Sequence, residues 1–290
     1  MSPLLPKIVA TCAAVLCVAA LPVPAAAAPA PASYVALGDS YSSGPGIPEQ
    51  RPDSGPCARS TRNYPSLVAG ALAPAEFRDV SCSGAVTGNM TGPQGTAPPQ
   101  FDALGADTEL VTLGIGGNDA GFASIVFTCA GLGSQDPAGK PCTDHYTKDG
   151  VDQIEATFAE VAPKVAATLQ GIHERAPKAT VVLVGYQTIL PDAKADCAPG
   201  NRNATMVAEG DLPYLTAKER SFAAMLSAQA AANGALFVDS RAASVGHDAC
   251  RAPGTRWIEG IYDAVDAAPV HPNALGMENV SRLVLDALSG

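Results

Sequence analysis

From residue 33 onward, short apolar runs alternate with longer amphipathic stretches. Runs of four to eight apolar and β-branched residues are typical of buried strands, and apolar residues three and four positions apart are typical of helices. The short runs predict strands at 34–37, 77–80, 110–115, 180–184 and 235–238. The amphipathic stretches predict helices at 64–72, 151–174, 215–233 and 272–288, the last with Pro272 near its first position. This alternation predicts an α/β domain with a central, mostly parallel sheet covered on both faces.

The segments between these elements are rich in Gly, Pro, Ser and Asp and are expected to be irregular. The two longest, residues 120–150 and 186–213, are interpreted as excursions from the sheet. No internal repeat or linker divides residues 33–290, so they are expected to form one domain.

Residues 1–32 have the pattern of a secretory signal peptide. Lys7 provides the positive start, and residues 8–20 are an apolar run too short for a membrane span. Small-residue cleavage sites follow at 25–27 and 30–32. No later stretch approaches the roughly 20 apolar residues that a spanning helix needs. The mature chain is therefore predicted to be secreted and extracellular, without an integral membrane segment.

The chain has a formal net charge of −10 and no cluster of Lys and Arg. This balance argues against nucleic acid as a partner and favours an uncharged small molecule or lipid as substrate. We expect the protein to be monomeric.

Cys12 and Cys17 would be lost with the signal peptide, which leaves an even number of cysteines in an exported chain. Three disulfides are therefore expected, and fifteen pairings are possible. Sequential pairing is favoured because each bond closes a local loop: Cys57–Cys82, Cys129–Cys142 and Cys197–Cys250. Zinc is the competing interpretation, but neither CxxC nor Cys/His spacing supports it.

Three predicted strands end in residues suited to acyl chemistry: Gly38-Asp39-Ser40, Ser83-Gly84 and Gly116-Gly117-Asn118-Asp119. The carboxyl ends of parallel strands share one edge of a sheet, where α/β proteins bind ligands. A backbone N–H at Ser40, another at Gly84 and the Asn118 amide could together bind an oxyanion. Taken singly, each has an ordinary alternative: Ser40 as a helix cap, Gly84 as a turn glycine, Asn118-Asp119 as a cap.

A serine nucleophile needs a base, and the chain has four histidines. His173 is expected at the polar end of a long helix, and His145 and His247 in surface loops. His271 precedes Pro272 at the start of the last helix, where it could lean over the sheet edge. It is the candidate base.

In order along the chain, Gly-Asp-Ser, an isolated Gly, Gly-Gly-Asn-Asp and a C-terminal His-Pro-Asn resemble the four blocks of the SGNH (GDSL-type) hydrolase family. The resemblance is closest to its secreted actinobacterial lipase/esterase branch, in which three local disulfides are usual. It implies a three-layer α/β/α flavodoxin-like fold and hydrolysis of carboxylic esters without metal or organic cofactor. Ser40 would be the nucleophile and His271 the base, and Ser40, Gly84 and Asn118 would form the oxyanion hole.

One position departs from the family pattern. The family usually has an aspartate three residues before the histidine, where this chain has Ala268. Asp266 and Asp263 are close but out of register, and Asp266 is kept as a possible substitute. The preferred interpretation is a Ser–His dyad in which a backbone carbonyl at Ala268 orients the imidazole.

The first hypothesis is a lipase or esterase that forms an acyl-enzyme on fatty-acyl esters, phospholipids among them, with the two excursions walling an acyl pocket. A carbohydrate O-acetyl esterase is the alternative within the same chemistry. A catalytically inactive secreted binding protein is the alternative from another class, and Ala268 is the only feature in its favour.

Overall fold

The computed structural model describes residues 30–201 and 204–290. Apart from its last three residues, the predicted signal peptide lies outside these ranges. In the described part of the chain, no helix combines the length and the apolar character needed to cross a bilayer.

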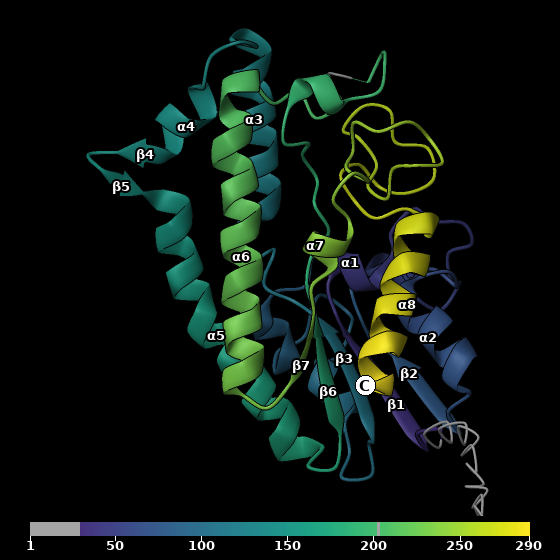
Figure 1. The fold of residues 1–290 in the computed structure, drawn as a ribbon. Coiled ribbons are helices and arrows are strands. Elements are labelled where there is room, and N and C mark those ends of the chain that lie inside the picture. The colour runs from purple at the N-terminus through teal and green to yellow at the C-terminus, as the bar shows by residue number, and fades with distance from the viewer. Residues whose placement is uncertain (1–29, 202–203) are drawn as a thin grey trace, which may run out of the picture.

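The centre of the fold is a five-stranded sheet in which every neighbouring pair is parallel (Figure 1). Its strands are β1 (Ser33–Gly38), β2 (Glu76–Asp79), β3 (Leu110–Gly114), β6 (Thr180–Val184) and β7 (Leu236–Val238). Their order in space is β2-β1-β3-β6-β7. This is the flavodoxin-like order, in which the strand sequence reverses at β1 and β3 and leaves a crevice at their carboxyl ends. The predicted fold class is confirmed.

Helices cover both faces of the sheet (Figure 1). Helices α5 (Gln153–Arg175) and α6 (Leu212–Ala232) lie on one face, and α2 (Tyr64–Leu72) and α8 (Ala274–Ser289) lie on the other. Side chains of β1 alternate between the two cores. Val35 and Leu37 belong to the apolar cluster that includes α5, whereas Tyr34 and Ala36 belong to the cluster that includes α2 and α8. The sheet is thus buried on both faces. This burial explains why its strands are almost continuously apolar in sequence.

The excursion predicted at 120–150 contains helices that the sequence pattern did not predict, and most of it is helical. It contains α3 (Phe122–Gln135) and α4 (Pro141–Tyr146), followed by a two-stranded hairpin of β4 (Thr147–Lys148) and β5 (Val151–Asp152). Phe122, Ile125, Val126 and Cys129 have helical spacing, but the Gly and Ser residues that follow at 131, 133 and 134 interrupt the pattern. The described residues between 186 and 211 are irregular as predicted, apart from short turns of 3₁₀ helix at Lys194–Asp196 and Glu209–Asp211, and α6 begins at Leu212.

The start of α8 also differs from the prediction. Asn273 caps the helix, and its side-chain oxygen accepts the Gly276 N–H at 3.0 Å. Pro272 therefore precedes the cap and does not occupy the first turn. This cap fixes where the loop that carries His271 meets the helix.

The predicted disulfide pairing is confirmed. Cys57 is bonded to Cys82, Cys129 to Cys142 and Cys197 to Cys250. Since all of these cysteines are bonded to one another, none is left as a thiolate ligand for zinc.

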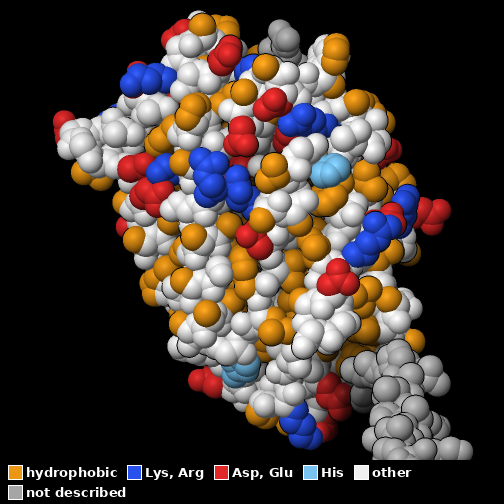
Figure 2. Space-filling view, viewed as in Figure 1, with side chains coloured by type: hydrophobic (Ala, Val, Ile, Leu, Met, Phe, Trp, Pro, Cys, Tyr) orange, Lys and Arg blue, Asp and Glu red, His pale blue; other side chains and the backbone are white. Residues whose placement is uncertain are grey.

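Charged side chains of both signs are interspersed on the face seen in Figure 2, with apolar atoms between them. This face carries no extended basic surface of the kind that binds the phosphates of nucleic acid.

Candidate active site

Ser40 is the first residue of α1 (Ser40–Ser43), a single helical turn directly after β1. Asp39 caps this turn, and its Oδ1 accepts the Tyr41 N–H at 2.9 Å. Gly38 has a φ of +142°, and a Cβ there would lie 2.4 Å from Ser42 Oγ and 2.6 Å from the Gly114 carbonyl. Glycine is therefore required for the sharp exit from the strand that places Ser40 at the sheet edge.

His271 reaches Ser40 from the other end of the chain. Its Nε2 lies 2.8 Å from Ser40 Oγ. The preceding residue, Val270, has a φ of +59°, which is strained for a β-branched side chain. Tyr41 offsets this strain, because its hydroxyl donates to the Val270 carbonyl at 2.9 Å and its ring packs 5.4 Å from the imidazole. Helix α1, which carries Ser40, thus also positions His271 through Tyr41.

The group that orients the imidazole is not the one predicted. His271 Nδ1 lies 2.8 Å from the carbonyl of Pro269, two residues before it. The Ala268 carbonyl instead accepts the backbone N–H of His271, at 3.2 Å. Asp266 is exposed and is not a hydrogen-bond partner of the imidazole among the described residues. The structure therefore corrects Ala268 to Pro269 and retains a backbone carbonyl as the orienting group.

The three predicted donors lie at neighbouring strand ends. Neither the Ser40 nor the Gly84 N–H has an acceptor within the described ranges. Gly84 has a φ of +81°, which favours glycine. Asn118 Nδ2 donates one hydrogen to the Ala85 carbonyl at 2.9 Å, and its second hydrogen is left for another acceptor. That bond ties the Asn118 side chain to the turn that carries Gly84.

Two further side chains hold the strand ends in place. Asp119 accepts the Thr87 N–H at 2.9 Å and the Thr87 hydroxyl at 2.6 Å, which joins the end of β3 to the Gly84 turn. Gln100 bonds both backbone groups of Gly38, at 2.8 and 2.9 Å. The site is thus assembled before any ligand binds, as electrostatic stabilisation of an oxyanion requires.

Burial shifts the ionisation of the site. Desolvation lowers the pKa of His271 below its usual value, and its bond to the Pro269 carbonyl acts weakly in the opposite direction. Desolvation also raises the pKa of Asp39 to about 7, although Tyr186 and the Tyr41 N–H favour its charged form. The imidazole is therefore held neutral, the state in which it can accept a proton.

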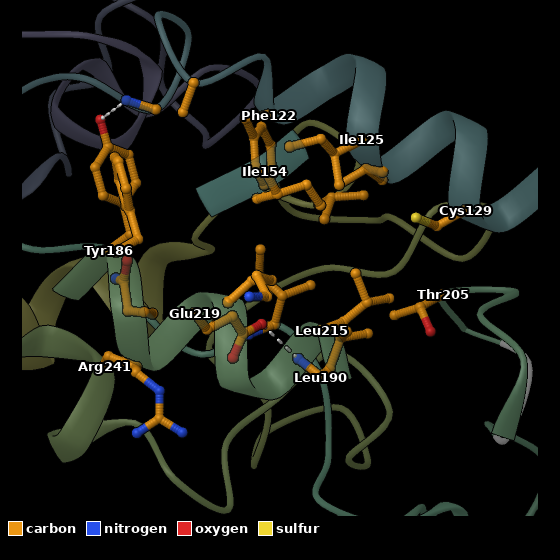
Figure 3. Close-up of a pocket in the computed structure, with 18 of the residues that line it drawn as sticks. Phe122, Ile125, Cys129, Ile154, Tyr186, Leu190, Thr205, Leu215, Glu219 and Arg241 are labelled. Atoms are coloured by element: carbon orange, nitrogen blue, oxygen red, sulfur yellow. Dashed lines mark hydrogen bonds between the residues drawn. The ribbon is translucent and has the colours of Figure 1, made fainter. Parts of the chain in front are cut away.

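An apolar pocket begins beside this site (Figure 3). Gly117 and Val270, the neighbours of Asn118 and His271, line it. Phe122, Ile125 and Ile154 lie on one side of the pocket, facing Leu190 and Leu215. Its empty volume, including open solvent, is about 960 Å³. The corrected helix α3 therefore provides much of one wall.

The structure brings Ser40, His271, Gly84 and Asn118 to one edge of the sheet, and it keeps the other histidines out of the Ser40 hydrogen-bond network. Sequence reasoning missed Pro269, Gln100 and Tyr186. Pro269 contributes only its backbone carbonyl, which leaves no signal in the sequence. Gln100 and Tyr186 lie in segments with no periodic pattern. Among the described residues, no three His, Cys, Asp or Glu side chains are grouped so that they could hold a metal ion.

Comparison with known proteins agrees with this arrangement. Residues 36–278 match the model of the GDSL-like lipase/acylhydrolase family. Lipase 2 of Streptomyces coelicolor is 42% identical over 259 residues, which cover 88% of this chain and 85% of that protein. The crystal structure of phospholipase A1 from Streptomyces albidoflavus superposes with a TM-score of 0.74 and 30% identity, covering 90% of this chain and 100% of that one. The extracellular lipase of Streptomyces rimosus gives a TM-score of 0.67 at 30% identity, covering 88% and 99%.

The family model spans most of the chain, and the matched region begins in β1 and ends in α8, so it includes every strand of the sheet and both Ser40 and His271. The resemblance predicted from the four sequence blocks is confirmed. The chain belongs to the GDSL-like lipase/acylhydrolase family and is a carboxylic ester hydrolase of the SGNH type.

Proposed function

We propose that the protein is a secreted lipase or esterase that cleaves fatty-acyl esters through a Ser40–His271 dyad. The observation that carries the proposal is the 2.8 Å contact between these side chains beside an apolar pocket. The signal-peptide pattern, the disulfides and the similarity to an extracellular lipase support secretion.

The reaction proceeds by two acyl transfers. His271 Nε2 accepts the Ser40 proton while Ser40 Oγ attacks the ester carbonyl, and the oxyanion binds to the N–H groups of Ser40, Gly84 and Asn118. His271 then protonates the departing alcohol, which leaves an acyl-serine. Water, deprotonated by His271, attacks this intermediate, and the collapse of the second tetrahedral adduct returns the proton to Ser40. The Pro269 carbonyl keeps the imidazole in the tautomer that can accept at Nε2.

The acyl pocket indicates the substrate. Its lining is mostly apolar, with Phe122, Ile125 and Leu215 among the side chains, and such a lining suits an alkyl chain longer than acetate. The similarity to a phospholipase A1 adds phospholipids to the candidate esters. We expect kcat/KM for p-nitrophenyl esters to rise from acetate to medium-length chains, by about tenfold or more, since each buried CH₂ contributes about 0.8 kcal/mol. Turnover of acetate alone would instead favour an O-acetyl esterase.

A matched pair of variants on α6 tests the pocket. Ala223 lines it, whereas Ala224 on the same helix is exposed. Ala223→Leu should lower kcat/KM for long chains and spare acetate, because the added side chain occupies space for the acyl group. Ala224→Leu should change neither. If the two variants show the same chain-length profile, the acyl chain does not bind in this pocket.

Loss of the Asn118 amide should lower kcat much more than it raises KM. We expect Asn118→Ala to lower kcat by about 10²–10³-fold with little change in KM, because the bond strengthens as charge develops on the carbonyl oxygen. Steady-state kinetics on a soluble ester will measure kcat and KM separately. A raised KM with unchanged kcat would show that Asn118 binds the ground state and the transition state equally.

The pH dependence should report His271. Burial lowers its pKa, and only the neutral imidazole accepts the serine proton, so activity is lost as pH falls through this lowered value. The acid limb of kcat/KM should therefore have its midpoint below pH 6.5. A midpoint at about 7 would instead assign the limb to Asp39, whose pKa is raised to about 7.

A further inference from the structure

The hydroxyl of Tyr186 lies between two of the turns that form the proposed oxyanion hole. It donates to Asp39 Oδ2 and accepts the Gly117 N–H at 2.9 Å, as the dashed line in Figure 3 shows for the second bond. Asp39 directly precedes Ser40, and Gly117 directly precedes Asn118. One phenol oxygen therefore connects the neighbours of two oxyanion donors that are 78 residues apart (Ser40 and Asn118).

The aromatic ring of Tyr186 packs against two other aromatic rings and against Gly117. Tyr41 packs edge-on to the ring with centroids 4.9 Å apart, and Phe222 packs at 5.6 Å. A Cβ at position 117 would lie 2.9 Å from the Tyr186 ring. The turn at Gly117 is thus in direct contact with the ring, so the hydroxyl has little freedom to move without moving this turn.

Each partner depends on this hydroxyl. Asp39 is 1% exposed, and within the described ranges its Oδ2 accepts only from Tyr186. The Gly117 N–H likewise has no other acceptor there. Without the hydroxyl, a buried carboxylate oxygen and a buried donor would both lack partners, and the two turns would relax to find new ones.

We propose that Tyr186 is a positioning residue of the oxyanion hole, whose hydroxyl fixes the Ser40 turn relative to the Asn118 turn. This inference rests on the proposed function of those turns. The ring of Tyr186 also lines the acyl pocket. The hydroxyl and the ring therefore have separable roles, since removing the oxygen leaves the wall of the pocket in place.

Tyr186→Phe tests the positioning role. We expect kcat to fall by about 10–100-fold at every chain length, because a displacement near 1 Å at a reacting centre can cost about 10²-fold. KM should stay within about twofold, since the ring remains. The inhibition constant of an alkylboronic acid, which forms a tetrahedral adduct on serine, should rise in step with the loss of kcat/KM.

Tyr34→Phe is the matched control. Tyr34 is fully buried, and its hydroxyl pairs with Thr112 within the core at 2.8 Å. This variant loses a buried hydrogen bond of the same kind, but its hydroxyl bonds no neighbour of a proposed donor, so it should lose stability and keep kcat. Equal losses of kcat in the two variants would attribute the effect to general destabilisation and overturn the proposal. A Tyr186→Phe variant with unchanged kcat, or with only a raised KM, would also overturn it.

Gly117→Ala approaches the same contact from the other side and remains available if Tyr186→Phe folds poorly. The added methyl group displaces the ring and should reproduce the loss of kcat. The double variant should be no slower than the worse single variant, because both remove one connection. If the losses of kcat in the two single variants multiplied in the double variant, the two residues would not act through one connection. Wild-type activity in Ser40→Ala would count against the proposed function itself and is distinguishable from all of these outcomes.

Discussion

Replacement of Ser40 by alanine is expected to lower kcat by about 10⁵–10⁶-fold, because loss of the proposed nucleophile removes the covalent route and leaves only binding and the proposed oxyanion donors. Ser40 is 6% exposed at the end of β1, and its hydroxyl is already bonded to His271, so no other group is needed to activate it. Turnover of p-nitrophenyl butyrate will measure the loss. Mass spectrometry after treatment with a fluorophosphonate should locate the covalent adduct on Ser40 in the wild type only.

Ser43→Ala supplies the control for this variant. Ser43 lies in the same helical turn, is fully buried, and its hydroxyl has no partner among the described residues. The same atomic deletion should leave kcat within about twofold of the wild type. Residual activity in Ser40→Ala above about 1% of the wild type, with the fluorophosphonate adduct elsewhere, would show that another residue is the nucleophile.

The strand ends were predictable because the physics that places them is local. A buried parallel strand must be apolar, and its end is marked where Gly, Asp and Ser interrupt the run. Ser40, Gly84 and Asn118 each follow such an interruption, so the sheet topology alone brings them to one edge. His271 was predictable by elimination, since the other histidines fell in polar contexts.

The residues that support this edge were not predictable in the same way. Tyr186 and Gln100 act through contacts between segments 147 and 62 residues apart, in stretches without periodicity. Pro269 contributes only a carbonyl, which every residue has, and the strained backbone at Val270 selects it over Ala268. Helix α3 was missed because the Gly and Ser residues in its second half lower its apparent helix propensity, and packing on the pocket overrides that preference.

Because the Pro269 carbonyl orients the imidazole, we expect very different losses of kcat when His271 and Asp266 are replaced. We expect His271→Ala to lower kcat by about 10⁴-fold or more, because no other base lies within reach of Ser40 Oγ in the described structure. Asp266→Ala should leave kcat within about twofold, since His271 Nδ1 lies 2.8 Å from the Pro269 carbonyl and Asp266 is exposed. Kinetics on the same soluble ester, with melting temperatures to establish folding, will compare the two.

The comparison of these two variants decides whether a backbone carbonyl is enough to orient His271 for catalysis. A backbone carbonyl fixes the tautomer of the imidazole as a carboxylate does, but it carries no charge to stabilise the imidazolium formed in the transition state. A dyad therefore relies more heavily on its oxyanion donors, which fits the bonds that join the Asn118 turn to the Gly84 turn. If Asp266→Ala lost about 10³-fold or more in a folded protein, the loop would have to close a carboxylate onto His271 during catalysis, and the dyad would be wrong.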